Sequence, residues 1–350
     1  MLKRALQQTG YILLILWGVV TLLFFLFNVL PGDPARMLTG QRTDKTTVEN
    51  IKRDLGLDLP QWQQYLLFLN DLSPLSIDHR HEQARYGGIT ILPINKTRIV
   101  AKMPYMRKSY QTKQPVTEMI ATVASASLLL AFSSILLAIF IGIPLGVFAA
   151  SKAETWIDRT IISISSIGMS LPSFFAAILI GWLFAFVLGK YTGLSLTGSM
   201  YNYDIDSKKL ALQNLILPSI TLGIRPLSVV VQLTRNSLLT EIKSDYFRTA
   251  RAKGLSIKNA IWKHALRNSL NPVVTALSGW FASMLAGMVF VEYIFSWKGL
   301  GYMLVDALNQ YDFPVVIGCI LFISVLFIAI NILTDLIYKM LDPQMRLKTI

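Results

Sequence analysis

Long apolar runs recur along this 350-residue chain and restrict the folds open to it. A helix of roughly 20 apolar residues crosses the hydrocarbon core of a bilayer, and each run reaches that length. The composition agrees, because hydrophobic residues make up 53% of the chain and charged residues only 15%, less than in soluble proteins of this size. We therefore predict an all-α polytopic membrane protein with six transmembrane helices, at residues 11–30, 116–150, 157–188, 215–239, 268–291 and 314–340.

The first run lies close to the N-terminus, where a secretory signal is the competing interpretation. Lys3 and Arg4 precede it, but its apolar core is longer than that of a signal peptide. Pro31-Gly32-Asp33-Pro34 follows, which ends a helix and does not resemble a cleavage site. We expect an uncleaved first span that starts on the cytoplasmic side.

Positive charge is distributed unevenly between the connections. Taken together, the N-terminus, residues 151–159, residues 240–267 and the C-terminal tail carry more Lys and Arg than residues 189–213 and 292–313 together. Short loops rich in Lys and Arg stay in the cytoplasm, so we expect both termini and the 240–267 loop there. The same rule explains the net charge of +13, and we expect no nucleic-acid partner.

The sequence divides into three parts. Residues 1–30 hold the N-terminus and the first span, and residues 31–115 form an extracytoplasmic region with short helices expected at 47–56 and 59–72. Residues 116–350 form a core domain with the other five spans and the basic loop 240–267. The sequence assigns no structure or role to residues 73–108.

Small residues and prolines interrupt several spans. Gly142 and Gly146 flank Pro144, and Gly279, Ser283 and Gly287 follow one another at four-residue spacing. Small residues let helices approach closely in lipid, so these stripes are candidates for close packing. The third span is expected to break at Leu171-Pro172-Ser173.

The basic stretch 245–272 lies between two spans. Residues 246–253 read as a short helix, which Gly254 can end in the left-handed conformation. Ser256 can then cap a second helix that runs toward the membrane. A short helix just outside a bilayer with an abrupt glycine break suits docking onto another protein.

This stretch resembles the cytoplasmic loop of ATP-binding-cassette importer permeases of the dipeptide, oligopeptide and nickel subclass. The matching positions are Tyr246, the run Thr-Ala-Arg-Ala-Lys-Gly-Leu at 249–255, His-Ala-Leu-Arg-Asn at 264–268, and Pro272. The broader importer pattern places Glu-Ala-Ala six residues before the glycine. Arg248 and Thr249 stand there instead, which is usual for the peptide subclass and narrows the resemblance.

Two further segments support the same resemblance. Residues 292–312 match a family pattern of Phe-x-Trp-Pro-Gly-x-Gly with a downstream Asp, although Lys298 replaces the usual proline. Residues 335–346 match the family's C-terminal Leu-Asp-Pro-x-x-Arg pattern, and Pro-Gly-Asp-Pro-Ala after the first span is also shared. The resemblance covers nearly the whole chain except residues 73–108.

The resemblance implies a type I importer transmembrane domain of the first-permease type in a bacterial inner membrane. Its partners would be lipid, a second permease that is homologous and forms a heterodimer, two cytoplasmic ATPase subunits or domains, and an extracytoplasmic substrate-binding protein. Peptide is the family's default substrate, with nickel chelates, glutathione-like compounds and sugars open. The residues implied to couple to the ATPase are Tyr246, Arg248, Thr249, Ala250, Arg251, Ala252, Lys253, Gly254 and Leu255.

The chain lacks the motifs of common catalytic and nucleotide sites. It contains no GxxxxGK[ST], HExxH, CxxC or GxSxG, so we expect no catalytic residue, metal site or cofactor in this chain. His79 and His81 could ligate a metal, but a solvated loop is favoured because no third ligand cluster is evident.

Arg225 is a charged residue well inside the fourth span, followed by Pro226. A charge at that depth is costly and normally faces protein or a water-filled cavity. It could meet a substrate carboxylate, while snorkelling or pairing with a neighbour is the favoured alternative. For Glu292, Asp306 and Asp312, capping or pairing in a loop is favoured over substrate contact.

Two other classes of protein stay open as alternatives. A secondary transporter driven by an ion gradient would need ionisable residues within the spans, and few acids lie there. It would ideally also show repeated halves, and no internal repeat is evident. A membrane-embedded hydrolase is disfavoured by the missing motifs.

Overall fold

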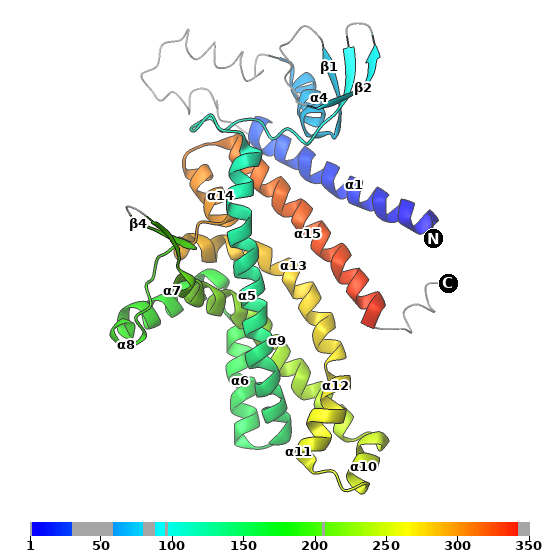
Figure 1. Ribbon diagram of the computed structural model, residues 1–350, viewed down its shortest axis with the longest axis vertical. Helices are drawn as coiled ribbons and strands as arrows, with labels where there is room; N and C mark the ends of the chain where they lie inside the picture. Colours follow the sequence, from blue (N-terminus) through cyan, green and yellow to red (C-terminus); the bar gives the residue numbers. More distant parts are fainter. Residues whose placement is uncertain (1, 30–58, 80–87, 95–96, 205–206, 342–350) are drawn as a thin grey trace. The chain divides into compact units, whose positions relative to one another are not determined.

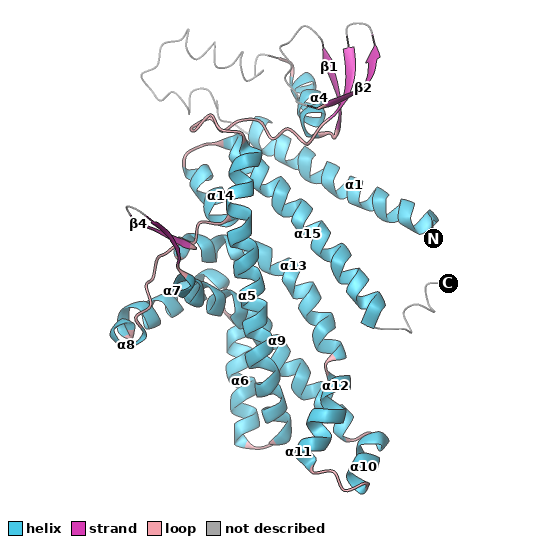
Figure 2. Cartoon of the chain, viewed as in Figure 1, coloured by secondary structure: helices cyan, strands magenta, loops and turns pink. Residues whose placement is uncertain are grey.

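The computed structural model describes residues 2–29, 59–79, 88–94, 97–204 and 207–341, and these are mostly helical (Figure 2). The longer helices are α1 (Leu2–Phe24), α4 (Gln61–Leu72), α5 (Val116–Ser151), α6 (Trp156–Ser170), α7 (Ser173–Gly181), α9 (Ile216–Ile242), α10 (Asp245–Ala252), α13 (Asn271–Ile294), α14 (Leu300–Asn309) and α15 (Phe313–Leu341). Short helical turns are η1 (Phe25–Val29), η2 (Trp182–Val187), α8 (Gly189–Thr192), η3 (Leu212–Leu215), α11 (Ile257–Ala260), η4 (Ile261–Ala265) and α12 (Leu266–Ser269). The strands are β1 (Leu75–His79), β2 (Ile89–Ile94), β3 (Thr97–Ala101), β4 (Tyr201–Asp204) and β5 (Ser207–Leu210).

The membrane-spanning helices agree with the prediction. Four helical stretches are long and apolar enough to cross a bilayer, and two bent pairs bring the number to six if each pair is one span. One pair joins α6 to α7 with a bend of 112°, and the other is a bend of 56° within α13. The break after α6 falls at Leu171 and Pro172, where the sequence predicts an interruption. The predicted helix at 47–56 lies outside the described residues.

The chain forms two compact units, and the first contains residues 1–123 and 303–325. Its apolar core joins α1, α4 and α15 through Val20, Leu23, Phe24, Phe68 and Leu321. Residues 303–325 therefore pack with the N-terminal part of the chain, although residues 124–302 separate the two segments in the sequence.

A three-stranded antiparallel sheet follows α4 in this first unit. Its strand order is β1-β3-β2, and the register pairs Leu75 with Ala101. A bulge interrupts the β2–β3 ladder between Thr90 and Leu92. This sheet occupies much of the 73–108 segment, and a second small sheet, β4-β5, lies in the 189–213 connection. The fold is thus helical with two small sheets that the sequence did not predict.

Buried polar contacts hold the connections of the first unit in place. The buried carboxylate of Asp71 accepts a hydrogen bond from Arg107 Nε at 3.1 Å, and Lys102 Nζ donates to the Asp71 carbonyl oxygen at 2.7 Å. At the start of α15, Asp312 accepts from Ser109 Oγ at 2.5 Å and from the Tyr110 amide at 2.9 Å. Asp312 therefore ties a loop to a helix, as the favoured capping interpretation predicts.

The second unit contains residues 124–302 together with residues from 326 onward, and α9 lies at its centre. Helices α6, α7 and α13 all pack against α9. Helix α5 approaches α9 through glycines: a Cβ added at Gly142 would lie 2.8 Å from Val230 Cγ1, and one at Gly146 only 2.6 Å from Thr234 Cβ. The predicted close packing is confirmed for this stripe.

The stripe on α13 behaves differently along its length. A Cβ at Gly287 would lie 3.4 Å from Ser173 Oγ, an approach between α13 and α7. A Cβ at Gly279 would meet nothing within 4 Å. Among the described residues, therefore, neither glycine of this stripe shows an approach as close as those of Gly142 and Gly146.

Candidate functional site

The segment between α9 and α13 folds as a small helical group at one end of the second unit. It consists of α10, α11, η4 and α12, and Figure 1 shows α10 and α11 beyond the same end of α9. Helix α10 begins at Asp245 and ends at Ala252, close to the predicted bounds of 246–253. This group contains every residue that the sequence implicates in coupling to an ATPase.

Glycine geometry sets the turn that follows α10. Gly254 has φ = +87°, a conformation that L side chains rarely adopt, and its amide donates to the Arg251 carbonyl oxygen at 3.0 Å. The Ser256 side chain then accepts from the Asn259 amide and caps α11. Both local predictions are confirmed, and Arg251 Nη1 adds a bond of 2.6 Å to the Leu255 carbonyl oxygen.

One face of this group is buried against the ends of two long helices. Phe247 of α10 packs into a cluster with Val147 of α5 and Leu238 of α9. The buried members of the cluster are Val147, Ala150, Leu238, Phe247, Ala260, Ile261, Ala265 and Leu266. Because the cluster joins residues from α5, α9, α10, α11, η4 and α12, the loop is part of the packed core of its unit.

Tyr246 adds a polar contact to this anchorage. Its hydroxyl donates to Glu241 Oε2 at 2.5 Å, which links α10 to the end of α9. Partial burial raises the pKa of the Tyr246 phenol, and the adjacent Glu241 carboxylate raises it further. The phenol therefore stays protonated at neutral pH and remains a donor.

The opposite face is exposed and basic. Arg248, Arg251 and Lys253 are all exposed, and the ion pair from Arg248 to Asp245 is long, at 3.6 Å, with both side chains largely in solvent. Such surface pairs contribute about 1 kcal/mol or less, so the Arg248 charge remains available to a partner. Within the described part of the chain, no ion pair involves Arg251 or Lys253. Thr249, Ala252 and Gly254 share this exposure.

Two features of this segment were not predicted from the sequence. Ala250 is only 8% exposed, because it lies with Phe247 on the buried side of α10. Its small side chain therefore packs within the chain and does not face outward. Ile257 and Trp262 are 57% and 48% exposed and place apolar surface beside the cations. The amphipathic pattern of residues 256–266 could have signalled these two residues.

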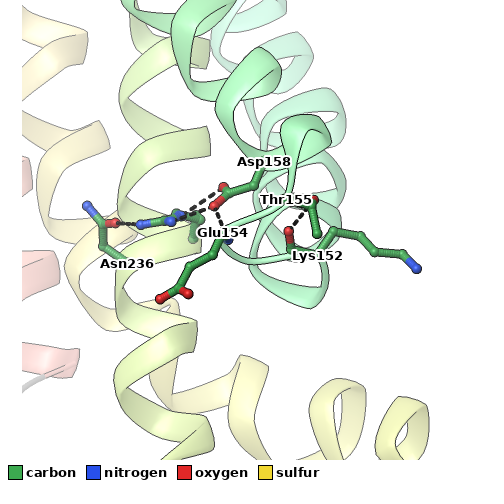
Figure 3. A network of polar contacts seen from close by, with 6 residues as sticks. Lys152, Glu154, Thr155, Asp158 and Asn236 are labelled. Carbon is green, nitrogen blue, oxygen red and sulfur yellow. Dashed lines mark hydrogen bonds and ion pairs between the residues drawn. The ribbon is translucent and has the colours of Figure 1, made fainter.

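An ion pair near the same end joins α6 to α9. Arg235 Nη2 and Nε bond the two carboxylate oxygens of Asp158 at 2.6 Å and 3.0 Å, and Asp158 also accepts from the Glu154 amide at 3.0 Å (Figure 3). Only 3% of the Asp158 side chain is exposed. The sequence did not reveal this pair, because 77 positions separate its members.

The other sequence candidates lie apart from this group. Arg225 is an exposed residue of α9 that lines an open pocket. His79 ends β1, and His81 lies outside the described residues; no group of three or more potential metal ligands occurs in the described part of the chain. Asp306 accepts a hydrogen bond from Gln310, and Glu292 is fully buried, so both have contacts within the chain.

The comparison with solved structures defines the class of fold. The structure matches an inward-facing crystal structure of the MetNI methionine ABC transporter with a TM-score of 0.52 and 17% identity, covering 65% of this chain and 98% of that one. A second inward-facing crystal form of that transporter gives 0.51 and 16%, covering 65% and 97%. The fold is that of a type I ABC-importer transmembrane domain.

Sequence comparison gives the family. Residues 142–347 match the binding-protein-dependent transport system inner membrane component, and residues 1–85 match the N-terminal part of such membrane components. The chain belongs to this family and is a multi-pass permease component of an inner membrane. No finding supports the alternative of an ion-driven secondary transporter.

Several relatives that match over nearly the full length are permeases of peptide transport systems. The dipeptide transport system permease protein DppB of Escherichia coli is 33% identical over 99% of this chain and 100% of its own length. The di/tripeptide transport system permease protein DppB of Pseudomonas aeruginosa is 32% identical over 99% of each chain. DppB of Alkalihalophilus pseudofirmus is 29% identical over 99% of this chain and 100% of its own length.

Proposed function

We propose that this chain is the permease subunit of an ATP-driven importer that takes up peptides delivered by an extracytoplasmic binding protein. The full-length similarity to dipeptide and di/tripeptide permeases supports peptide over nickel chelates or sugars as the substrate. The chain binds no cofactor, and two partner ATPase subunits hydrolyse ATP. A second, homologous permease completes the translocation pathway as a heterodimer.

The distribution of charge supports the orientation that we propose in the membrane. In this orientation both termini and the α10–α12 group lie in the cytoplasm. Short connections rich in Lys and Arg are retained on that side, and these connections carry the most of both. The ATPase subunits then meet the chain at α10.

The observation that most directly supports coupling of the chain to the ATPases is that α10 has one buried face and one exposed, basic face. Its inner face is anchored on α5 and α9 through Phe247, and its outer face presents Arg248, Arg251 and Lys253 to solvent. We propose that this outer face lies in a groove of the ATPase, where the cations meet acidic or carbonyl groups. Closure of the ATPases on ATP would then move the anchored ends of α5 and α9 together, as a rigid body.

A glycine substitution tests this proposal. In Gly254→Val, a β-branched residue must adopt φ near +87°, so we expect the turn after α10 to distort. Peptide uptake in the reconstituted importer should fall at least about tenfold while ATP hydrolysis continues, because the two are uncoupled.

The matched control is Gly193→Val. Gly193 also has a left-handed φ, of +65°, and no atom lies within 4 Å of its added Cβ, but it ends α8, far along the chain from α10. This variant should retain most of its uptake at equal abundance in the membrane. Normal uptake by Gly254→Val would contradict the coupling role.

A further inference from the structure

Arg225 lies at a depth where a membrane helix rarely carries a charge. It is the tenth residue of α9, so at about 1.5 Å per residue it lies roughly 14 Å along the helix axis from Ile216. The hydrocarbon core is about 30 Å thick, so if α9 enters it near Ile216 this position lies well within it. A cation there requires a compensating group or access to water.

The side chain of Arg225 lines a pocket between α7, α9 and α13. The pocket has a volume of about 530 Å³, within the range of small-molecule sites. Trp280, Met284 and Phe290 of α13 supply apolar and aromatic walls. The guanidinium carbon of Arg225 lies 5.6 Å from the centre of the Trp280 ring, a cation–π contact that fixes the head group at the pocket wall.

The described residues provide no counter-charge for Arg225. Across the described ranges, no carboxylate forms an ion pair with it. The hydroxyls of Thr221 and Ser283 also line the pocket, but they donate to the carbonyl oxygens of their own helices, Leu217 and Trp280. Arg225 is therefore the group in this pocket that can bind an anion strongly.

The start of α7 adds positive potential to the same pocket. Ser173, the first residue of this nine-residue helix, lines the pocket, and no side chain caps the helix start. The free amide groups at a helix N-terminus carry partial positive charge and favour anions. The cation and the helix start thus act on one cavity from two different elements.

We infer that this pocket is a carboxylate subsite, in which Arg225 receives the C-terminal carboxylate of a peptide during translocation. The planar guanidinium suits a carboxylate because it can donate two parallel hydrogen bonds. The apolar walls suit the adjacent side chain of the peptide. The inference rests on the proposed function, because it requires peptides as the substrate.

The test compares one dipeptide as its free acid and as its C-terminal amide, using uptake by the complete importer in proteoliposomes. A preference for acid over amide elsewhere in the importer would act equally on every variant, so the measured quantity is the acid-to-amide uptake ratio of each variant divided by that of the wild type. In Arg225→Gln this quotient should fall about tenfold or more, since one charge-assisted contact is lost only for the acid. Arg225→Lys keeps the positive charge and should stay within about threefold of the wild type.

Lys190→Gln is the control, because it removes one positive charge at an exposed position of α8 outside the pocket. Its quotient should equal that of the wild type. An equal fall of acid and amide uptake in Arg225→Gln, or a quotient in Arg225→Lys as low as in Arg225→Gln, would overturn the inference. The first result would indicate that Arg225 supports the fold or pairs with the second permease. Failure of the wild-type importer to take up either dipeptide would instead contradict the proposed function.

Discussion

Glu292 is a fully buried carboxylate at the end of α13, and three donors surround it. Ser127 Oγ donates to one oxygen at 2.6 Å, and the amides of Gly301 and Tyr302 donate to the other at 2.7 Å and 3.2 Å. An added Cβ at Gly299 would lie only 2.3 Å from Glu292 Oε1, so glycine is required for this approach. The residue joins α5, α13 and the start of α14.

We predict that Glu292→Gln destabilises the protein. An amide offers one acceptor oxygen, and its NH₂ group faces donors on the other side, so at least one buried donor loses its acceptor. Each such loss costs about 1–3 kcal/mol. Thermal unfolding in detergent, followed by circular dichroism, measures the effect. Asp306→Asn, which alters a carboxylate whose hydrogen bond to Gln310 is exposed, should unfold within about a degree of the wild type.

At the scale of elements, the contact between α6 and α9 depends on a pair in which one partner is buried. Arg235 bonds both oxygens of Asp158, and the pair lies near the turn between α5 and α6 (Figure 3). Two bonds in fork geometry make such a pair stronger and more directional than a single contact. The pair therefore fixes how these two helices meet.

A double-mutant cycle with Asp158→Asn and Arg235→Gln should give a coupling energy of about 1–3 kcal/mol in unfolding. The same cycle on Asp245 and Arg248, a pair with both members exposed, should give a value near zero. Additive effects of the Asp158 and Arg235 substitutions would show that their contact contributes nothing to stability.

The elements also show which parts of the fold the sequence could predict. The spans could be predicted because crossing a membrane imposes a length and a hydropathy on each segment separately. The turn at Gly254 and the helix cap at Ser256 could be predicted because turn and cap chemistry is local. The β1–β3 sheet was missed because strands of five or six residues carry little pattern of their own. The inward orientation of Ala250 and the Asp158–Arg235 pair depend on neighbours distant in sequence.

At the scale of the whole molecule, the proposed orientation can be tested through cysteine chemistry. Cys319 is the single cysteine of the chain and is buried. Two single-cysteine variants can be made in a Cys319→Ala background. One carries Lys253→Cys, at an exposed position, and the other carries Met103→Cys, at a position that is 87% exposed.

A membrane-impermeant thiol reagent applied to intact cells should label Met103→Cys and leave Lys253→Cys unlabelled. In inside-out vesicles the pattern should reverse, because the proposed orientation has residues 31–115 outside and residues 240–267 inside. Labelling of Lys253→Cys in intact cells would contradict both the orientation and the site proposed for the ATPase.

The buried contacts of Phe247 have a mechanical consequence. Phe247 shares one buried apolar cluster with Val147 of α5 and Leu238 of α9, so α10 is held against the ends of both helices. We therefore expect a force applied to the exposed surface of α10 to be transmitted to both of these long helices.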